Sequence, residues 1–76
     1  MAIRGMHVPG WNTTETVTAP FGEVVMTKIH DDDGERNVAK LLRVYGYDNL
    51  WFLPDKSMYV YYTPTHWRHL PKEIAA

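Results

Sequence analysis

The side chains of this sequence that could do chemistry gather in two short stretches. In the first, His30 is followed by aspartates at 31–33, which places an imidazole beside three carboxylates. Zinc takes about four such ligands in tetrahedral order, and calcium takes about six to eight oxygens from a loop of defined length. The run DDDG has neither the length nor the spacing of a calcium loop. Acidic turns are common without any ligand, so we interpret this stretch as a solvated hairpin tip and expect no metal.

The second stretch, MYVYYTPTHWR, places a histidine among threonines near the end of the sequence. His66 beside Thr63 and Thr65 is a pattern in which an imidazole could activate a hydroxyl, and His66 with His69 could chelate a metal on a helical turn. Catalysis also needs a group that orients the base and a pocket that excludes water, which a sheet of 76 residues rarely makes. We therefore expect no catalytic residue, no cofactor and no enzyme.

The Thr65-His66-Trp67 motif is better explained by structure. A threonine can cap a turn through its hydroxyl, a buried histidine usually bonds a backbone group, and a tryptophan buries a large area. We expect Thr65 to cap a final turn, His66 to bond the backbone and Trp67 to fill the core. The motif would then clamp the tail to the rest of the protein.

Length and charge exclude several classes of protein. Seventy-six residues form one domain at most, and 8 basic against 9 acidic residues give a net charge of −1. The absence of cysteine excludes disulfides, thiolate nucleophiles and cysteine-type zinc sites. The stretch MAIRGMHVPG lacks the apolar run of a secretory signal, and no run approaches the roughly 18–20 apolar residues of a membrane helix. We therefore expect a cytoplasmic protein that does not contact a membrane.

Turn-forming residues divide the chain into three parts. Residues 1–21 contain glycines, prolines and a polar run, which predict an extended arm whose TETVT stretch, 14–18, could form a short edge strand. Trp11 is the residue that we expect to anchor this arm on a sheet. Residues 22–71 are predicted to form a single small β domain, and residues 72–76 a frayed tail.

Alternation and turn signals predict strands within the domain. GEVVMTKIH at 22–30 is rich in β-branched residues, and the Asp-Gly of the following DDDGE is a strong hairpin signal. The next run, RNVAKLLRVYG, fits a strand and a helix equally well, because its apolar residues satisfy both periods. LWFL at 50–53 and MYVYY at 58–62 indicate two further strands, each followed by a proline.

We predict a mainly β fold: a small antiparallel meander of about four strands with the extended arm and a folded-back C-terminal tail. The alternative is an α+β fold with a short helix at 37–45. The predicted core consists of Val25, Ile29, Leu41, Leu50, Phe52, Met58, Val60, Tyr62 and Trp67.

Strand alternation at 58–62 separates its aromatic residues, with Tyr59 and Tyr61 on the face opposite the core. An exposed aromatic face could stack nucleic-acid bases, but the chain is slightly acidic and has no RNP-like motif. Tyrosine and tryptophan also dominate the energetics of protein interfaces, which favours a protein partner. The candidate partner-binding residues are Trp51, Tyr59, Tyr61 and Arg68. In the nucleic-acid alternative, phosphates would be contacted by Lys28, Lys40, Arg43 and Arg68.

The run NLWFLPDKSMYVYYTPTHWRHLP, residues 49–71, resembles a family of short uncharacterised phage and prophage proteins that end in a Thr-His-Trp motif followed by Leu-Pro. FGEVVMTKIHDDDGERN also looks like the first strand and turn of that family. One departure is His69, where members commonly carry proline. Members place poor helix formers in the region of 36–45, so the resemblance favours a strand there and an antiparallel meander.

The resemblance implies a phage-derived accessory protein that acts in the cytoplasm of a bacterial host. Such proteins often bind and inhibit a host enzyme or defence system, and the family brings no established activity with it. The expected partner is therefore a host or phage protein, or a second copy of the chain. A small nucleic-acid-binding module that uses an aromatic sheet face is the alternative.

Overall fold

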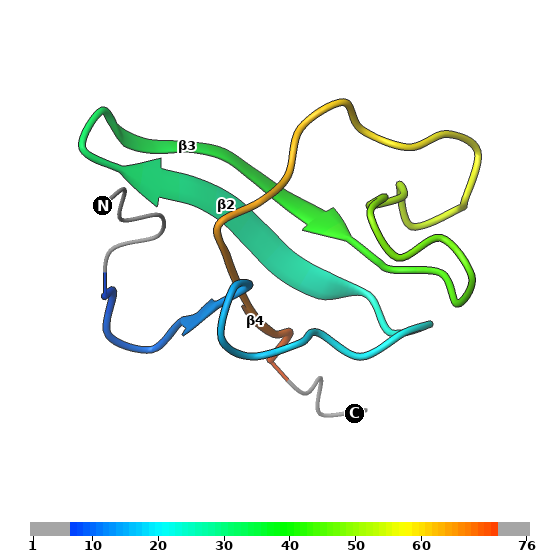
Figure 1. Ribbon diagram of the computed structural model, residues 1–76, viewed down its shortest axis with the longest axis horizontal. Coiled ribbons are helices and arrows are strands. Elements are labelled where there is room, and N and C mark those ends of the chain that lie inside the picture. The colour runs from blue at the N-terminus through cyan, green and yellow to red at the C-terminus, as the bar shows by residue number, and fades with distance from the viewer. Residues whose placement is uncertain (1–6, 72–76) are drawn as a thin grey trace, which may run out of the picture.

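Four antiparallel strands form one sheet at the centre of the molecule (Figure 1). The strands are β1 (Asn12–Thr13), β2 (Val25–Asp31), β3 (Gly34–Leu41) and β4 (His66–His69), and they lie in the order β1-β4-β2-β3. Every neighbouring pair is antiparallel. The prediction of a mainly β fold with four antiparallel strands is confirmed, and β2 and β3 are the two strands that a tight hairpin joins.

The computed structural model describes residues 7–71. In this range the chain forms no helix, and therefore none that is long and apolar enough to cross a membrane. The first part of the expected arm, residues 1–6, and the expected frayed tail, residues 72–76, lie outside the described residues.

The β2–β3 hairpin forms at the predicted Asp-Gly turn because Gly34 supplies a positive φ of +102°. Asp31 pairs with Gly34 across the turn. Its carboxylate accepts hydrogen bonds from the Asp33 amide at 2.9 Å and from two nitrogens of the Arg36 guanidinium at 2.8 and 3.0 Å. The bonds from Arg36 and Asp33 lower the pKa of Asp31 to about 2. This carboxylate therefore holds the turn together.

The run that fitted both a strand and a helix is a strand as far as Leu41, so the alternative helix at 37–45 is wrong. The hairpin turn delivers this run directly beside β2, and backbone pairing with β2 outweighs its local helical tendency. Val38, which belonged to the apolar face of the expected helix, is 53% exposed.

A bulge interrupts the β2–β3 ladder at its middle. The register shifts between Thr27 and Ile29, so that Asn37 and Val38 of β3 together lie opposite Lys28 of β2. Asn37 has a φ of +56°, a conformation that asparagine tolerates better than most residues. A bulge bends its strand and increases the local twist. Beyond it, Ile29 is only half-buried rather than part of the core.

The two strands predicted at 50–53 and 58–62 are wrong. These segments make single bridges, from Phe52 to Leu42 and from Phe52 to Tyr59, and no ladder. Here the chain bridges back only to Leu42, directly after β3, and leaves the outer edge of β3 itself unpaired within the described residues. The fourth strand is instead β4, which the tail forms between β1 and β2.

The arm joins the sheet through β1, which pairs with β4. Its edge strand lies slightly earlier than the predicted 14–18, because the amides of Thr16 and Val17 both turn back to the Thr13 carbonyl, at 3.3 and 2.9 Å. The Thr14 amide donates to the Thr65 carbonyl at 2.9 Å, and the Thr14 hydroxyl donates to the Pro64 carbonyl at 2.8 Å. These bonds connect the arm to the segment that enters β4.

One face of the sheet carries the apolar core. The core cluster consists of Ala19, Val25, Leu41, Trp51 and Trp67, with Ala39, Leu53, Val60 and Tyr62 packed against it. The prediction is confirmed for Val25, Leu41 and Trp67, which are at most 3% exposed.

Of the other predicted core residues, Val60 and Tyr62 are partly buried against the cluster, and the rest lie further out. Met58 is 52% exposed, so its placement in the core is wrong, and Leu50 and Phe52 are half-buried. These errors follow from assuming strand alternation in two segments that are not strands.

Candidate functional site

An aromatic row crosses the surface of the irregular segment between β3 and β4. It consists of Tyr47, Phe52, Tyr59 and Tyr61, which contact one another in that order edge to face. Successive ring centroids are 5.6, 6.0 and 5.5 Å apart. Pairs with this geometry stabilise each other beyond the area that they bury, typically by about 0.5–1.5 kcal/mol. The row is therefore a defined surface rather than four independent side chains.

Phe52 lies at the centre of the aromatic row and makes two isolated backbone bridges, one to Leu42 and one to Tyr59. Its amide donates to the Leu42 carbonyl at 2.8 Å and its carbonyl accepts from the Leu42 amide at 3.0 Å. Adjacent extended residues point to opposite sides, so Trp51 enters the core while Phe52 faces outward. The bridge to Leu42 places the row relative to the sheet.

A turn at PDKS returns the chain past Phe52. The Leu53 amide donates to the Met58 carbonyl at 2.9 Å, and the Val60 amide donates to the Trp51 carbonyl at 2.9 Å. Inside the turn, the Asp55 carboxylate accepts from the Ser57 amide at 2.9 Å, and its hydrogen bonds to Ser57 lower the pKa of Asp55. The turn thereby sets Tyr59 beside Phe52 and Tyr61 beside Tyr59.

The three tyrosines of the row are open to solvent. Tyr61 is 87% exposed, Tyr47 55% and Tyr59 40%, while Phe52 beneath them is half-buried. Met58, adjacent in sequence to Tyr59, adds a further exposed apolar side chain. Few small proteins leave this many large apolar side chains uncovered in one segment without using them.

The structure brings together only two of the four predicted partner-binding residues. Tyr59 and Tyr61 are in contact and exposed, as predicted. Trp51 is 5% exposed and belongs to the core, so its assignment to the surface is wrong. Arg68 lies on β4, where its guanidinium carbon is 5.0 Å from the Trp11 ring centroid.

Sequence reasoning missed Tyr47 and Phe52, which complete the aromatic row. Tyr47 lies in a turn, where no alternation pattern assigns a face, and Phe52 was assigned to the core. The available signal was the density of aromatic residues between 45 and 62, read without regard to strand faces.

The Thr65-His66-Trp67 motif clamps β4 into the sheet. The Thr65 hydroxyl accepts a hydrogen bond from the His30 amide at 2.9 Å, and it is 2.7 Å from Nδ1 of His66, which is fully buried. The Trp67 indole fills the core and donates to the Val17 carbonyl at 2.8 Å. The predicted cap on a final turn is wrong, since the threonine hydroxyl joins two strands instead.

Thr65 and His66 have the separation of a nucleophile and its base, but the contacts around them are structural. The hydroxyl oxygen is already occupied by the His30 amide, and the imidazole has no exposed surface. A reacting hydroxyl has to reach a substrate in a pocket, and this one bonds within the sheet. The geometry therefore supports the clamp.

The residues of the two metal hypotheses do not have the arrangement that metal binding would require. His66 and His69 lie on a strand rather than a helical turn, and His69 is bonded to Glu23 at 2.6 Å at the surface. At the acidic tip, the Asp31 carboxylate is held by Arg36. Within residues 7–71, no three histidine or acidic side chains gather as metal ligands.

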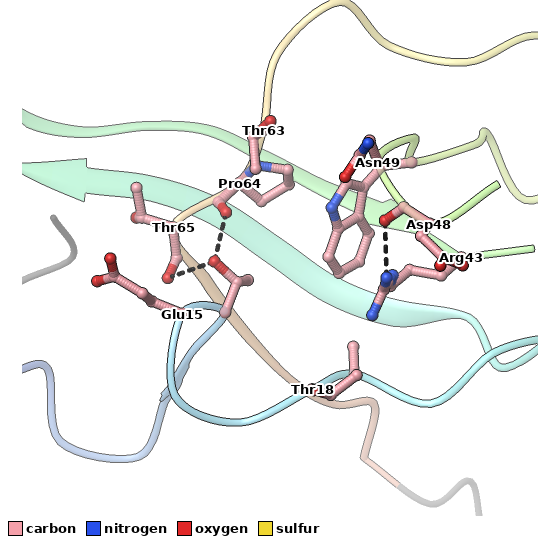
Figure 2. Close-up of a pocket in the computed structure, with 11 residues that line it drawn as sticks. Glu15, Thr18, Arg43, Asp48, Asn49, Thr63, Pro64 and Thr65 are labelled. Carbon is pink, nitrogen blue, oxygen red and sulfur yellow. Dashed lines mark hydrogen bonds between the residues drawn. The ribbon is translucent and has the colours of Figure 1, made fainter.

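A cleft of about 640 Å³ separates the arm from the start of the irregular segment (Figure 2). Thr65 lies on one side, with Pro64 above it, and Arg43 lies on the other; Thr14 and Trp51 also line the cleft. The Arg43 guanidinium donates to the Asp48 carbonyl at 2.7 Å and stacks over Phe21 at 4.5 Å. The guanidinium is therefore used to hold the wall of the cleft.

The cations that would contact phosphates in a nucleic-acid complex are largely engaged within the protein. Lys28 is 2% exposed and donates to Glu35 at 2.5 Å, a contact that lowers the pKa of Glu35. Arg43 bonds Asp48, and Arg68 lies over Trp11. The fourth predicted contact, Lys40, is exposed on β3.

Comparison with known proteins adds no relative: no family model, no curated protein and no solved structure matches this chain.

Proposed function

We propose that this chain is a non-enzymatic binding module that contacts another protein through the aromatic row. The observation that carries the proposal is the row itself: four rings in continuous edge-to-face contact, with three tyrosines exposed. Tyrosine side chains combine a large apolar surface with a hydroxyl and lose little rotamer freedom when they are covered. They are among the side chains most often found at the energetic centre of an interface.

Preorganisation supports the same proposal. Each ring of the row is held by its neighbour, so binding would immobilise few additional side chains. The cost of ordering side chains is a main reason why a large contact area often yields weak affinity. A row that is already ordered is therefore well suited to a protein partner.

The partner that we propose is a host protein of a bacterium, met by a phage-derived accessory protein in the cytoplasm. This part rests on the resemblance of residues 49–71 to phage and prophage proteins, in which the THW motif is the specific feature. Inhibition of a host enzyme or defence system would be the consequence of such binding. A second copy of the chain is the other protein partner that the row could accept.

Affinity capture from host lysate tests the proposal. The bait is the full chain, compared with a Tyr47→Ser/Tyr61→Ser variant that shortens both ends of the row. Tyr45→Ser is the matched control, since Tyr45 is 83% exposed but contacts Phe21 rather than the row. We expect one captured protein whose affinity, remeasured with purified components, falls at least about tenfold in the double variant and is unchanged in the control.

Equal binding by the wild type and the double variant would overturn the proposed surface. Light scattering over a range of concentrations separates self-association through the row from binding to a second protein. Anisotropy titrations with single-stranded DNA and RNA at low salt test the alternative. A salt-dependent affinity there would favour a nucleic-acid module instead.

A further inference from the structure

The guanidinium of Arg43, in the wall of the cleft, carries a positive charge that no carboxylate of the described residues neutralises. Its one hydrogen bond within residues 7–71 runs from Nη2 to the backbone carbonyl of Asp48, at 2.7 Å. The carboxylates of this range that pair with basic side chains pair elsewhere: Glu35 with Lys28, Asp31 with Arg36 and Glu23 with His69. Arg43 is half-buried, and a charge removed from water usually has an opposite charge beside it.

Aromatic rings hold the Arg43 guanidinium in place. Its central carbon is 4.5 Å from the ring centroid of Phe21 and 5.9 Å from that of Trp51. The backbone is fixed as well, since the Arg43 carbonyl accepts from the Gly22 amide at 2.7 Å. Stacking uses the faces of a guanidinium and leaves the N–H groups at its edge available. A cation positioned in this way would lose little freedom on binding an anion.

Two nitrogens of this guanidinium make no hydrogen bond within the described residues. Nε is buried without a partner, and Nη1 is also unpartnered but accessible. A donor left unsatisfied in a folded protein often marks the place of a water molecule or a ligand. Figure 2 shows the Arg43 side chain extending into the cleft, with its hydrogen bond to Asp48 on one side. Nη1 is therefore the donor that an anion in the cleft would reach.

The rest of the lining supplies further groups that can bind a small anion. Thr18, Asn49 and Thr63 come from separate parts of the chain, are exposed, and make no side-chain hydrogen bond within residues 7–71. Hydroxyl and amide groups are neutral donors that can complete the hydrogen bonds of a carboxylate. Ala19 and Trp51 add apolar surface. A volume of about 640 Å³ lies within the range of sites for small molecules.

The charges of the lining favour a ligand with one negative charge. Arg43 is the only basic residue among the described residues that line the cleft, and Glu15 and Asp48 are acidic. A dianion such as sulfate would meet one cation and two acidic residues, so that repulsion offsets much of the attraction. A carboxylate carries a single charge, and its two oxygens match the planar guanidinium. Figure 2 shows the Glu15 carboxylate pointing away from Arg43.

We propose that the cleft binds a small organic acid with a single carboxylate, which is held by Arg43 and by the hydroxyl and amide groups of the lining. The apolar part of the acid lies against Trp51. None of the four residues of the aromatic row lines the cleft, so this site is separate from the proposed protein-binding surface. Because the arm and the irregular segment both contribute to the lining, a bound acid connects them.

Titrations of the full chain with small acids, followed by NMR, test the proposal. The probes are acetate, lactate and benzoate at constant ionic strength, and the reporters are the Trp51 indole N–H and the backbone amides of Thr18 and Asn49. We expect saturable shifts at these reporters, with a Kd of about 1–10 mM for the best acid. The neutral counterparts acetamide, lactamide and benzamide should bind at least about tenfold more weakly.

Two results of these titrations would overturn the proposal. One is the absence of a saturable shift with all three acids. The other is tighter binding of sulfate than of every acid, because it would contradict the assignment to a single carboxylate.

Two variants locate the bound acid. Arg43→Gln removes the guanidinium and should weaken binding of the best acid at least about tenfold. Arg68→Gln is the matched control, because Arg68 also stacks on a tryptophan, 5.0 Å from the Trp11 ring centroid, but does not line the cleft. Its variant should keep the wild-type affinity. Equal affinity of the wild type and Arg43→Gln would refute Arg43 as the group that holds the acid.

If Arg43→Gln fails to fold, Asn49→Asp tests the same point at an exposed position of the lining. This substitution adds a negative charge with almost no change of shape, so the affinity for the best acid should fall about fivefold. Urea denaturation checks that the variant is as stable as the wild type. An affinity that does not change in Asn49→Asp would refute an anion in the cleft.

Discussion

The sheet and the irregular segment at 42–63 are built from similar residues but are held together in different ways. In the sheet, ladders of paired residues position the backbone, and Trp67 fills the core. In the irregular segment, the backbone makes three isolated bridges, and edge-to-face contacts between aromatic rings complete the arrangement. Figure 1 shows this segment as a wide loop beyond the end of β3.

The comparison shows how one chain assigns its aromatic residues to two tasks. Trp51 and Trp67 are buried on the apolar side of the sheet, whereas Tyr45, Tyr47 and Tyr61 are more than half exposed. Tryptophan has the larger apolar area to bury, and tyrosine carries a hydroxyl that remains satisfied in water. The sheet is thus the scaffold, and the segment is the surface that the scaffold presents.

The largest effect is expected from Trp67→Ala, which removes the centre of the scaffold. Trp67 is 3% exposed and its indole also bonds Val17, so truncation should lower the free energy of unfolding by about 3–5 kcal/mol. Urea denaturation followed by circular dichroism measures the loss. A variant as stable as the wild type would contradict the assignment of Trp67 to the core.

Thr65→Val tests the junction between the two regions. The substitution keeps the shape of the side chain but leaves the His30 amide and His66 Nδ1 without their shared partner. Loss of stability should be about 1–3 kcal/mol in urea melts. Thr63→Val, at an exposed position two residues earlier, should stay within about 0.5 kcal/mol of the wild type.

Two glycine substitutions test whether the sheet and the irregular segment unfold together. Gly34 in the hairpin and Gly46 in the segment have φ values of +102° and +94°, with open space around the position of an added Cβ. Alanine at either site should cost about 1–2 kcal/mol through backbone strain alone. If the regions form one cooperative unit, both variants lower the urea midpoint to a similar extent. A midpoint unchanged by Gly46→Ala would show that the segment unfolds separately from the sheet.

Acid sensitivity distinguishes the hairpin tip from the rest of the sheet. The Arg36 contact holds the pKa of Asp31 at about 2, below its ordinary 3.8. Its stabilising contribution is therefore complete above pH 4 and is lost as the pH falls toward 2. The urea midpoint should fall as the pH is lowered from 4 to 2, and in Asp31→Asn it should fall less over this interval. Asp32→Asn in the same tip should leave the decline as it is.

The smallest effect on stability is expected from Tyr61→Ser, which alters the presented surface alone. At 87% exposure the ring has little buried area to lose, so the free energy of unfolding should change by less than about 0.5 kcal/mol. The same variant should weaken partner binding. A clear loss of stability would mean that the aromatic row supports the fold and is not free for a partner.

Much of the sheet could be predicted from short-range signals. The hairpin at DDDGE followed from the conformational freedom of Gly34, and burial of Val25 followed from alternation in β2. The strand β4 could not be predicted in this way, because the pattern HWRH is short and places a buried histidine beside a buried tryptophan. Its partners β1 and β2 are far from it in sequence, and long-range strand pairing produces no local sequence pattern from which it could be predicted.

The candidate site was only half predictable for a related reason. Tyr59 and Tyr61 were assigned to the surface from the alternation expected of a strand at 58–62, and they are exposed although no strand forms there. The same assumption placed Trp51 on the surface and Met58 in the core, and both assignments are wrong. Alternation assigns faces only where a ladder keeps the chain extended.

The bulge opposite Lys28 has a consequence for how the chain behaves at high concentration. β3 is the last strand of the sheet, and an open strand edge is a template on which further chains can add and aggregate. Asn37, with its positive φ, breaks the row of backbone donors and acceptors in the middle of that edge, and Glu35 and Lys40 place charges on either side. The edge is thereby protected from recruiting another strand through its backbone.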